Sequence, residues 1–544
     1  MIDLSLLPVA LAGLVLSVLV ERLLIPRPAL RRPASCWLLH VGLWCVGFGL
    51  LYGLTGRALF SGVNLLLLWT LVVLVSNAKY HSLREPFVCA DFEYFSDAVK
   101  FPRLYLPFFG YAKAAGLALG FVVYLWAGLS FEVPGARLDA VLLVAVGMSL
   151  VRLGRRAVVP SFDAERDVRE WGLAASLWRY FWAARMPVDR GRLGSPFAGD
   201  CGGAGAASSR GKPAPTGGVV GSKGLREREF DAVASVGPST LGLPDLVSVQ
   251  SESFFDVRGL WAGVRPEVLS EFDRLGRESL AHGKLQVAAW GANTVRTEFA
   301  YLTGIAADRL GVHRFNPYRV LARQGLPSIA STLRAKGYRT VCIHPYAGSF
   351  YGRDKVLPAL GFDAFIDVRA FNESQKAGPF IGDYAVAQKI RQLLQEEDRD
   401  QPLFIHAITM ENHGPLHLES VTDAELPAWF DRPLQAGMKD LAPYLRHIAN
   451  ADRMLGLLRD TLLEQPNEAL LCFFGDHVPI LPEVYQAVGA PAGDTDYLVW
   501  SNRRQPGSAP CPVRVDALSS ALLGHALAGA GDAQSTVPAA VVAV

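Results

Sequence analysis

Five apolar segments near the start of the chain constrain its fold more than any other feature. The segments run over Leu4–Leu24, Ser35–Leu54, Ala58–Ser76, Phe108–Phe131 and Leu138–Leu153. Each reaches or approaches the length that an α-helix needs to cross a bilayer. A soluble core could not easily cover five such helices, and 51% of all 544 residues are hydrophobic. The sequence therefore predicts an N-terminal polytopic α-helical membrane domain of about five helices over residues 1–155.

Charges in and around these segments bear on their arrangement in the membrane. The first segment has neither a basic leader nor a small-residue cleavage site, which predicts that it stays in the protein as a membrane helix. Glu21 and Lys113 lie near segment ends, where their side chains are expected to reach the interface. The first loop is basic, with Arg22, Arg27, Arg31 and Arg32. A cytoplasmic first loop and five crossings would leave the rest of the chain in the cytoplasm.

Residues 156–243 differ in composition from both of their neighbours. The segment EWGLAASLWRYFWAARM, residues 170–186, alternates aromatic and charged residues and is typical of a helix lying in a membrane interface, although a plain packing helix fits as well. Residues 194–224 are rich in Gly, Ala, Ser and Pro. This region is therefore predicted to hold an interfacial helix and a flexible linker.

From residue 244 onward, short β-rich runs alternate with helical patterns. The runs are DLVSVQ, KLQVAAWG, TVCIHPY, PLFIHAITM, ALLCFFGDH and DYLVWSN. Between them, segments such as PSIASTLRAKG and YAVAQKIRQLLQEED place apolar residues three and four positions apart. This alternation predicts an α/β domain with a mostly parallel central sheet over residues 244–505, followed by a C-terminal extension over residues 506–544.

Unusual polar residues gather where the predicted strands end, which is the functional edge of parallel sheets. Glu252 follows the first run, and Asp476 and His477 end the run ALLCFFGDH. Mixed carboxylate and imidazole ligands suit Mn²⁺, Zn²⁺ or Mg²⁺. Thr294 follows a small-residue turn and precedes a predicted helix whose N-terminal end favours an anion. Because a hydroxyl beside a cation loses its proton more readily, Thr294 is a candidate nucleophile.

Five motifs stand in order along the second domain. They are VQSESFFD, GANTVRTEFAYLTG, GYRTVCIHPYAGSFYGRDKVLPALGFDAF, ITMENHGPL and FFGDHVPI. Together they resemble the catalytic domain of the lipoteichoic acid synthase and phosphoglycerol transferase family, within the alkaline phosphatase and sulfatase superfamily. The resemblance covers residues 244–505 and implies a sulfatase-like α/β fold there. Five helices before a large extracytoplasmic catalytic domain also match the family's arrangement.

The resemblance implies roles for individual residues. Glu252, Asp476 and His477 match the family's metal ligands. Thr294 matches the threonine that both contacts the metal and attacks phosphorus. His413 matches a histidine that contacts the bound phosphoryl group and is placed to help protonate the leaving alcohol.

A substrate pocket is implied in the same way. Arg353 and Tyr351 match the arginine and the aromatic residue that line the glycerol-phosphate pocket, with His344 near them and His413 at the phosphoryl group. Gram-positive synthases of the family have Trp where this chain has Tyr351. This difference from the family lies in the pocket that would select the head group. It therefore leaves the identity of the substrate open, more than the reaction that the enzyme performs.

The activity implied by the resemblance is a two-step transfer. Phosphoglycerol would pass from the phospholipid phosphatidylglycerol to Thr294, giving a phospho-threonine intermediate, and then to a glycan or glycolipid acceptor of the cell envelope. The implied cofactor is one divalent metal ion, with Mn²⁺ preferred and Mg²⁺ or Zn²⁺ as alternatives. Such an enzyme would be a multi-pass protein of the bacterial inner membrane with an extracytoplasmic catalytic domain. That orientation contradicts the one given by the arginine count.

Other functions stay open at this point. A phosphoethanolamine transferase, or a phosphodiesterase in which water replaces the acceptor, uses closely similar metal chemistry. A catalytically inactive membrane scaffold is the alternative of another class. A sulfatase with a formylglycine precursor is disfavoured, because CPVR at Cys511 does not fit the Cys/Ser-x-Pro-x-Arg pattern. Nucleic-acid binding has little support, since the net charge is only +2 and the basic residues cluster beside membrane segments.

Overall fold

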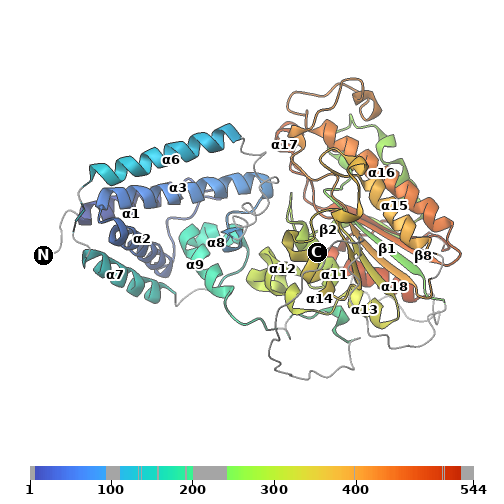
Figure 1. Ribbon diagram of the computed structural model, residues 1–544, viewed down its shortest axis with the longest axis horizontal. Helices are drawn as coiled ribbons and strands as arrows, with labels where there is room; N and C mark the ends of the chain where they lie inside the picture. Colours follow the sequence, from blue (N-terminus) through green and yellow to red (C-terminus); the bar gives the residue numbers. More distant parts are fainter. Residues whose placement is uncertain are drawn as a thin grey trace, which may run out of the picture. The chain divides into compact units, whose positions relative to one another are not determined.

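The chain divides into two compact units, Met1–Val188 and Asp189–Val544 (Figure 1). The computed structural model describes residues 6–92, 111–132, 134–135, 138–155, 159–189, 191, 193–199, 242–396, 399–504, 506–507 and 509–528. Most of the predicted flexible linker, the last residues of the C-terminal extension and the Lys113 side chain lie outside the described residues.

The first unit is helical, and all five apolar segments form helices. They are α1 (Leu6–Glu21), α2 (Ala34–Thr55), α3 (Ala58–Leu83), α6 (Tyr111–Phe131) and α7 (Leu138–Gly154). Among the described residues, α2 and α3 are long and apolar enough to cross a membrane, with mean hydropathies of 1.7 and 2.3. The predicted helical domain is therefore confirmed, whereas five crossings are not.

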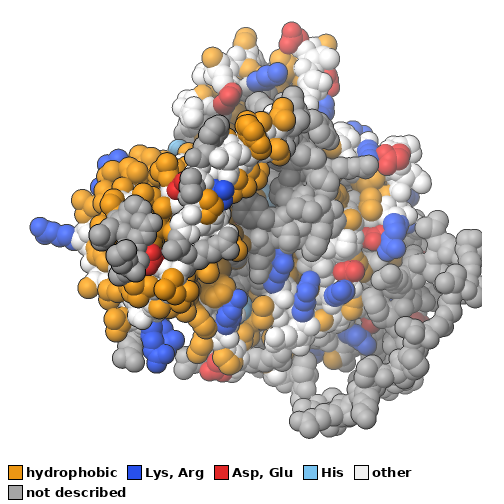
Figure 2. All heavy atoms as spheres, turned by 60° about the vertical axis from the view of Figure 1, so that its left-hand side comes forward, with side chains coloured by type: hydrophobic (Ala, Val, Ile, Leu, Met, Phe, Trp, Pro, Cys, Tyr) orange, Lys and Arg blue, Asp and Glu red, His pale blue; other side chains and the backbone are white. Residues whose placement is uncertain are grey.

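Apolar side chains face outward along these helices. Leu67, Leu71 and Leu74 of α3 and Trp126 of α6 are each more than half exposed. Figure 2 shows hydrophobic side chains gathered over the surface of this unit. A contiguous apolar surface of this kind suits contact with lipid better than contact with water.

Helices α2 and α7 approach closely because glycines face each other between them. A Cβ added to Gly42 would lie 2.8 Å from the Gly147 carbonyl oxygen, and one added to Gly147 would lie 2.7 Å from the Gly42 oxygen. These distances are too short for a real Cβ, so the packing requires glycine at both positions. Small residues that bring two backbones together are typical of helix pairs in membranes.

Glu21 lies at the end of α1, and its side chain is buried within the unit. Its fully buried carboxylate accepts a hydrogen bond from Arg32, with Nη1 and Oε2 2.6 Å apart. The backbone N–H groups of Leu173 and Ala174 donate to Oε1 at 2.8 and 3.4 Å. The sequence could not show that a later helix returns to the end of α1. Arg32 is consequently neutralised inside the unit, which weakens its value as a marker of a cytoplasmic loop.

The aromatic segment forms two helices, α8 (Ala164–Trp171) and α9 (Leu173–Ala183), separated by Gly172 at φ 83°. Trp171 and Ala175 pack in one buried cluster with Leu39 of α2. Trp182, two turns after Ala175 and near the end of α9, is 46% exposed. The packing interpretation is therefore confirmed for the start of α9, and an aromatic side chain remains exposed near its end.

The second unit is built on an eight-stranded sheet with the order β10-β2-β9-β8-β1-β7-β3-β4. Every strand in it except β9 runs in the same direction, which confirms the predicted, mostly parallel sheet. A separate hairpin pairs β5 (Lys376–Ala377) with β6 (Phe380–Ile381). The strands of the main sheet are β1 (Asp245–Ser251), β2 (Ala281–Gln286), β3 (Arg339–Ile343), β4 (Ala364–Ile366), β7 (Leu403–Ile408), β8 (Ala469–Gly475), β9 (Thr495–Ser501) and β10 (Val513–Arg514).

Helices cover both faces of this sheet (Figure 1). Val247 and Val249 of β1 belong to the core under α15 and α16, whereas His406 of β7 stacks on Tyr301 of α11 with ring centroids 5.3 Å apart. The longer helices are α10 (Ser270–Glu278), α11 (Thr294–Thr303), α15 (Asp383–Leu394), α16 (Leu441–Leu463) and α18 (Val515–Leu527). The shorter ones are α12 (Pro317–Val320), α13 (Ile329–Ala335), α14 (Arg353–Ala359) and α17 (Pro482–Val488).

The run KLQVAAWG is the least accurate of the strand predictions, because β2 ends at Gln286. Trp290 packs edge-on against Tyr485, with ring centroids 5.8 Å apart, and joins no strand. Gly291 and Asn293 then have φ values of 75° and 67°, which turn the chain into α11. Apolar residues after a strand can therefore belong to a loop that packs against the domain, and they need not continue the strand.

Candidate metal and phosphoryl-transfer site

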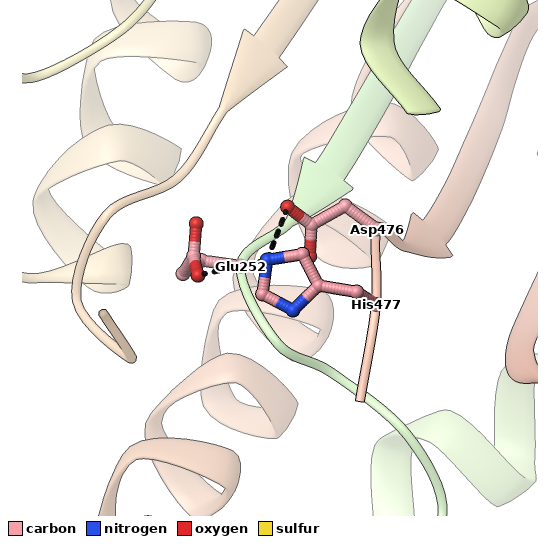
Figure 3. A group of neighbouring side chains, drawn as sticks. All are labelled: Glu252, Asp476 and His477. Atoms are coloured by element: carbon pink, nitrogen blue, oxygen red, sulfur yellow. Dashed lines mark ion pairs between the residues drawn. The ribbon is translucent and has the colours of Figure 1, made fainter. Parts of the chain in front are cut away.

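Two neighbouring strands bring the three predicted metal ligands together. In the parallel ladder between β1 and β8, Ser251 is the partner of Gly475. Glu252 and Asp476 follow these residues directly, so both acids leave the sheet at the same edge, with His477 next to them. Figure 3 shows the His477 ring between the two carboxylates. His477 Nε2 lies 3.5 Å from Glu252 Oε1 and 3.4 Å from Asp476 Oδ2.

The three side chains form a buried cluster with the dimensions of a metal site. One ligand atom from each of Glu252, Asp476 and His477 lies within 4.8 Å of the other two. All three residues are at most 4% exposed. Two acids at this depth are costly unless a positive charge compensates them.

The charges of the cluster favour the binding of a cation between the two acids. Burial, helped by Glu252 and opposed by His477, raises the pKa of Asp476 to about 7. Asp476 Oδ2 has no hydrogen-bond partner among the described residues, although the atom is buried. Against the effect of burial, the carboxylates of Asp476 and Glu252 raise the pKa of His477. A divalent cation would compensate both acids and use the unpartnered oxygen.

The orientation of the His477 ring fits the same interpretation. Its Nδ1 lies 3.1 Å from the Val478 carbonyl oxygen, which can only accept, so Nδ1 carries the hydrogen. In the neutral ring, the lone pair of Nε2 then faces Glu252 and Asp476. Metal-ligating histidines are commonly held by this kind of second hydrogen bond. One imidazole and two carboxylates suit Mn²⁺, Mg²⁺ or Zn²⁺.

Thr294 lies next to this cluster as the first residue of α11. Its Oγ1 is 3.4 Å from Glu252 Oε2. Asn293 precedes it in the left-handed region, so the helix begins abruptly and its first N–H groups face outward from the turn. The positive end of the helix dipole therefore lies beside Thr294, where it favours negative charge.

Ser253 supports the cluster. It donates from Oγ to Glu252 Oε1 at 2.9 Å and from its backbone N–H to Asp476 Oδ1 at 2.8 Å. Thr409, at the end of β7, accepts from the Glu252 N–H at 3.0 Å. Sequence reasoning did not identify these supporting roles, since a serine beside an acid suggests a nucleophile as readily as a hydrogen-bond donor.

The residues of the predicted substrate pocket also lie close together. Arg353 Nη1 is 3.0 Å from His344 Nε2, and its guanidinium lies over the Tyr351 ring at 5.3 Å. Burial and the Arg353 charge lower the pKa of His344 well below its usual value, and His413 adds to the shift. His413 packs against Phe380 of β6 with ring centroids 5.4 Å apart. Tyr351 has a positive φ of 55°, a conformation that favours glycine.

Glu298 was missed by sequence reasoning. It lies in α11, is fully buried and forms an ion pair with Arg353, with Oε2 and Nη2 2.6 Å apart. Its signal in the sequence is the spacing of four residues from Thr294, which places both on one face of a helix.

Comparisons with known proteins find a matching family model and several relatives. A family model described as "Sulfatase" matches residues 244–528. A Rhizobium meliloti protein named for cyclic beta-1,2-glucan modification is 30% identical over 287 residues, covering 50% of this chain and 44% of that protein. The capsular polysaccharide biosynthesis protein RkpI of the same species is 24% identical over 489 residues, covering 85% and 81%.

Two further matches are to a synthase and to a solved structure. Lipoteichoic acid synthase 1 of Bacillus subtilis is 26% identical over 187 residues, which cover 34% of this chain and 28% of that protein. The solved structure of the Streptococcus pyogenes phosphoglycerol transferase GacH with sn-glycerol-1-phosphate superposes with a TM-score of 0.44 and 20% identity, covering 53% and 75%. The chain thus spans less than half the length of the glucan modification protein and of the synthase.

Proposed function

Because the chain belongs to the sulfatase family, we propose that it is a membrane-anchored, metal-dependent transferase that moves phosphoglycerol from phosphatidylglycerol to an envelope glycan or glycolipid. The observation that carries this proposal is the buried cluster of Glu252, Asp476 and His477 with Thr294 Oγ1 3.4 Å from Glu252. Membership in the family does not make the chain a sulfate-ester hydrolase, since it lacks the formylglycine pattern.

The proposed domains follow the same logic. Residues 1–155 form the membrane domain, residues 156–243 the interfacial helix and linker, residues 244–505 the catalytic domain, and residues 506–544 the C-terminal extension. The membrane domain holds the catalytic domain beside a lipid donor that stays in the bilayer. The donor and an envelope acceptor meet on the outer side of the bacterial inner membrane, which favours an extracytoplasmic catalytic domain.

Glu252, Asp476, His477 and Thr294 are the proposed metal-binding residues. A divalent cation held there, with Mn²⁺ preferred over Mg²⁺ or Zn²⁺, would supply positive charge to the phosphoryl oxygens and lower the pKa of the threonine hydroxyl. Ser253 keeps Glu252 and Asp476 oriented through its two hydrogen bonds. The α11 N-terminus adds its dipole on the side of the nucleophile.

In the first step, Thr294 Oγ1 releases its proton to water and attacks phosphorus, and the bond between phosphorus and the diacylglycerol oxygen breaks. Phosphoglycerol remains on Thr294 as a phosphodiester. His413 Nδ1 lies 2.8 Å from the Gly414 carbonyl oxygen, so Nδ1 carries a hydrogen and Nε2 is the nitrogen that exchanges protons. Protonated His413 gives its Nε2 proton to the leaving diacylglycerol oxygen.

In the second step, an acceptor hydroxyl attacks the same phosphorus atom. Its proton passes to His413 Nε2, the bond from phosphorus to Thr294 Oγ1 breaks, and Thr294 regains its hydroxyl by taking a proton from water. Arg353, Tyr351 and His344 bind the glycerol head group during both steps. The relatives named for glucan modification, capsular polysaccharide biosynthesis and lipoteichoic acid synthesis support an envelope glycan or glycolipid as the acceptor.

Head-group release from defined phospholipids tests this proposal. Full-length protein in detergent is incubated with Mn²⁺ and head-group-labelled phosphatidylglycerol or phosphatidylethanolamine. We expect diacylglycerol to form from phosphatidylglycerol in the wild type and not in Thr294→Ala. Preference for phosphatidylethanolamine would favour a phosphoethanolamine transferase, and release without transfer to any glycan would favour a phosphodiesterase. Absence of turnover with either lipid would favour an inactive scaffold.

A further inference from the structure

Arg353 and Glu298 form a fully buried ion pair between two helices of the second unit. Arg353 Nε donates to Glu298 Oε1 and Oε2 at 3.1 and 3.2 Å, and Nη2 donates to Oε2 at 2.6 Å. The side chains are 1% and 0% exposed. A guanidinium that meets a carboxylate through two nitrogens is fixed in plane as well as in distance.

The pair is the centre of a longer buried chain of hydrogen bonds. Tyr318 donates its hydroxyl to Glu298 Oε1 at 2.5 Å. Arg353 Nη1 donates to His344 Nε2 at 3.0 Å, and His344 Nδ1 donates to the Ile408 carbonyl oxygen at 3.1 Å. Hydrogen bonds therefore run without a break from Tyr318 through Glu298, Arg353 and His344 to the last residue of β7.

This chain is tied to the nucleophile through a single helix. Glu298 follows Thr294 by four residues in α11, so one helical turn separates the two side chains. Arg353 is the first residue of α14, a different helix. Glu298 is therefore the direct connection between the residue proposed to attack phosphorus and the residue proposed to bind the head group.

Resting on the proposed function, we propose that Glu298 is a positioning residue that fixes Arg353 in the head-group pocket relative to Thr294. Glu298 touches no substrate in this role, because Arg353 and Tyr318 use both of its oxygens. The pair is neutral as a unit and offers no free carboxylate to an ammonium group. The N–H groups of Arg353 that neither Glu298 nor His344 uses would suit a head group that carries hydroxyl oxygens.

Kinetics of the full-length protein with two donors test this role. Phosphatidylglycerol carries the head group, whereas bis(p-nitrophenyl) phosphate is a phosphodiester without one. For Glu298→Gln we expect KM for phosphatidylglycerol to rise about tenfold, with kcat changed less than about twofold, because a ground-state contact is displaced. Both constants for the head-group-free diester should stay near the wild-type values. Glu298→Asp should recover part of the KM.

Controls separate positioning from simple support of the helix. Glu278→Gln removes a carboxylate paired with Arg459 in the same unit and should change neither donor's kinetics. Thr294→Ala should abolish turnover of both donors. An equal loss with both donors in Glu298→Gln would show that Glu298 only stabilises α11, and unchanged kinetics with both would show that it has no role; either result overturns the proposal. A wild-type preference for phosphatidylethanolamine would overturn the head-group assignment.

A binding measurement distinguishes failure of the positioning role from failure of the proposed transfer. Calorimetric titration with sn-glycerol 1-phosphate is made on wild type and Glu298→Gln in the presence of Mn²⁺. If the wild type cleaves no lipid but binds this probe, and Glu298→Gln binds it about tenfold more weakly, the positioning role stands and the transfer proposal fails. If the wild type neither cleaves lipid nor binds the probe, both proposals are rejected.

Discussion

Buried carboxylates occur in both units, but they are compensated differently. Glu21 in the helical unit is paired with Arg32 and accepts two backbone N–H groups at the start of α9. Glu252 and Asp476 in the catalytic unit share one histidine, and an oxygen of Asp476 has no hydrogen-bond partner among the described residues. Both oxygens of Glu21 are thus hydrogen-bonded and its charge is paired, although Arg32 Nη2 is buried without a hydrogen-bond partner among the described residues. The two acids of the second arrangement have only one histidine between them, which favours a cation there.

The difference separates a structural acid from a ligand-binding one. Glu21 joins α1, the first loop and α9, so its loss should affect stability without affecting chemistry. Glu252 and Asp476 repel each other at a strand edge, so their loss should affect metal binding and turnover more than folding. Four experiments test whether the two kinds of acid differ in this way.

The largest expected effect is on turnover in Thr294→Ala. Removing the nucleophile should lower kcat for phosphatidylglycerol by at least about a thousandfold. Ser253→Ala should lower it by about tenfold, because Ser253 orients the two acids without reacting. Diacylglycerol release measured at saturating lipid compares the two variants. A larger loss in Ser253→Ala than in Thr294→Ala would assign the nucleophile to the serine.

The next largest effect is on stability in Glu21→Gln. The variant should lose about 3–5 kcal/mol of unfolding free energy, because Arg32 is left buried with an unpaired charge. Denaturant unfolding in detergent measures the loss. The double variant Glu21→Gln/Arg32→Met should recover much of it, since no charge is then left unpaired. Equal losses in the single and double variants would show that the pair is not the cause.

Metal removal should affect the unit that holds Glu252 and Asp476. At a free Mn²⁺ concentration about a hundredfold above Kd, the ion should stabilise the wild type by about 3 kcal/mol, and a chelator should remove that stabilisation. Asp476→Asn should be insensitive to both Mn²⁺ and chelator. Thermal unfolding with and without chelator tests this. A wild-type melting temperature that does not respond to any divalent ion would contradict the metal site.

The smallest expected effect concerns a buried histidine that is compensated like Glu21. Against the effect of burial, hydrogen bonds to Glu411 and Glu419 raise the pKa of His447 to about 9. A raised pKa stabilises the fold at low pH, and the stabilisation is lost as pH rises from about 6.5 through 9. Between pH 7 and pH 9 the unfolding free energy should fall by about 2 kcal/mol. His447→Gln should flatten this slope in denaturant titrations, and an unchanged slope would refute the assignment.

Much of the catalytic unit could be predicted because its strands, helices and strand-end residues are visible in short stretches of sequence. Alternating strand and helix patterns imply a parallel sheet, and polar residues after the strands then meet at one edge. Glu252 and Asp476 follow that rule. The motif resemblance to lipoteichoic acid synthases and phosphoglycerol transferases is confirmed by the family match and by the synthase relative.

What could not be predicted depends on contacts between distant segments. That β8 lies beside β1 is a property of sheet order, which strand patterns do not contain. The burial of Glu21 depends on the return of α9 to the end of α1. The pairing of Glu298 with Arg353 depends on the packing of two helices 55 residues apart in sequence. Periodicity shows which face of a helix or strand is apolar. It does not show which polar side chains on two different elements will form a hydrogen bond or an ion pair.

The most direct test of the central claim is a mass spectrum of the trapped intermediate. Full-length protein with Mn²⁺ is mixed with phosphatidylglycerol in the absence of acceptor, quenched in acid and digested for peptide mapping. The account predicts a phosphoglycerol adduct on Thr294, absent from Thr294→Ala. An adduct on Ser253, or diacylglycerol release with Thr294 left unmodified at every quench time, would contradict it.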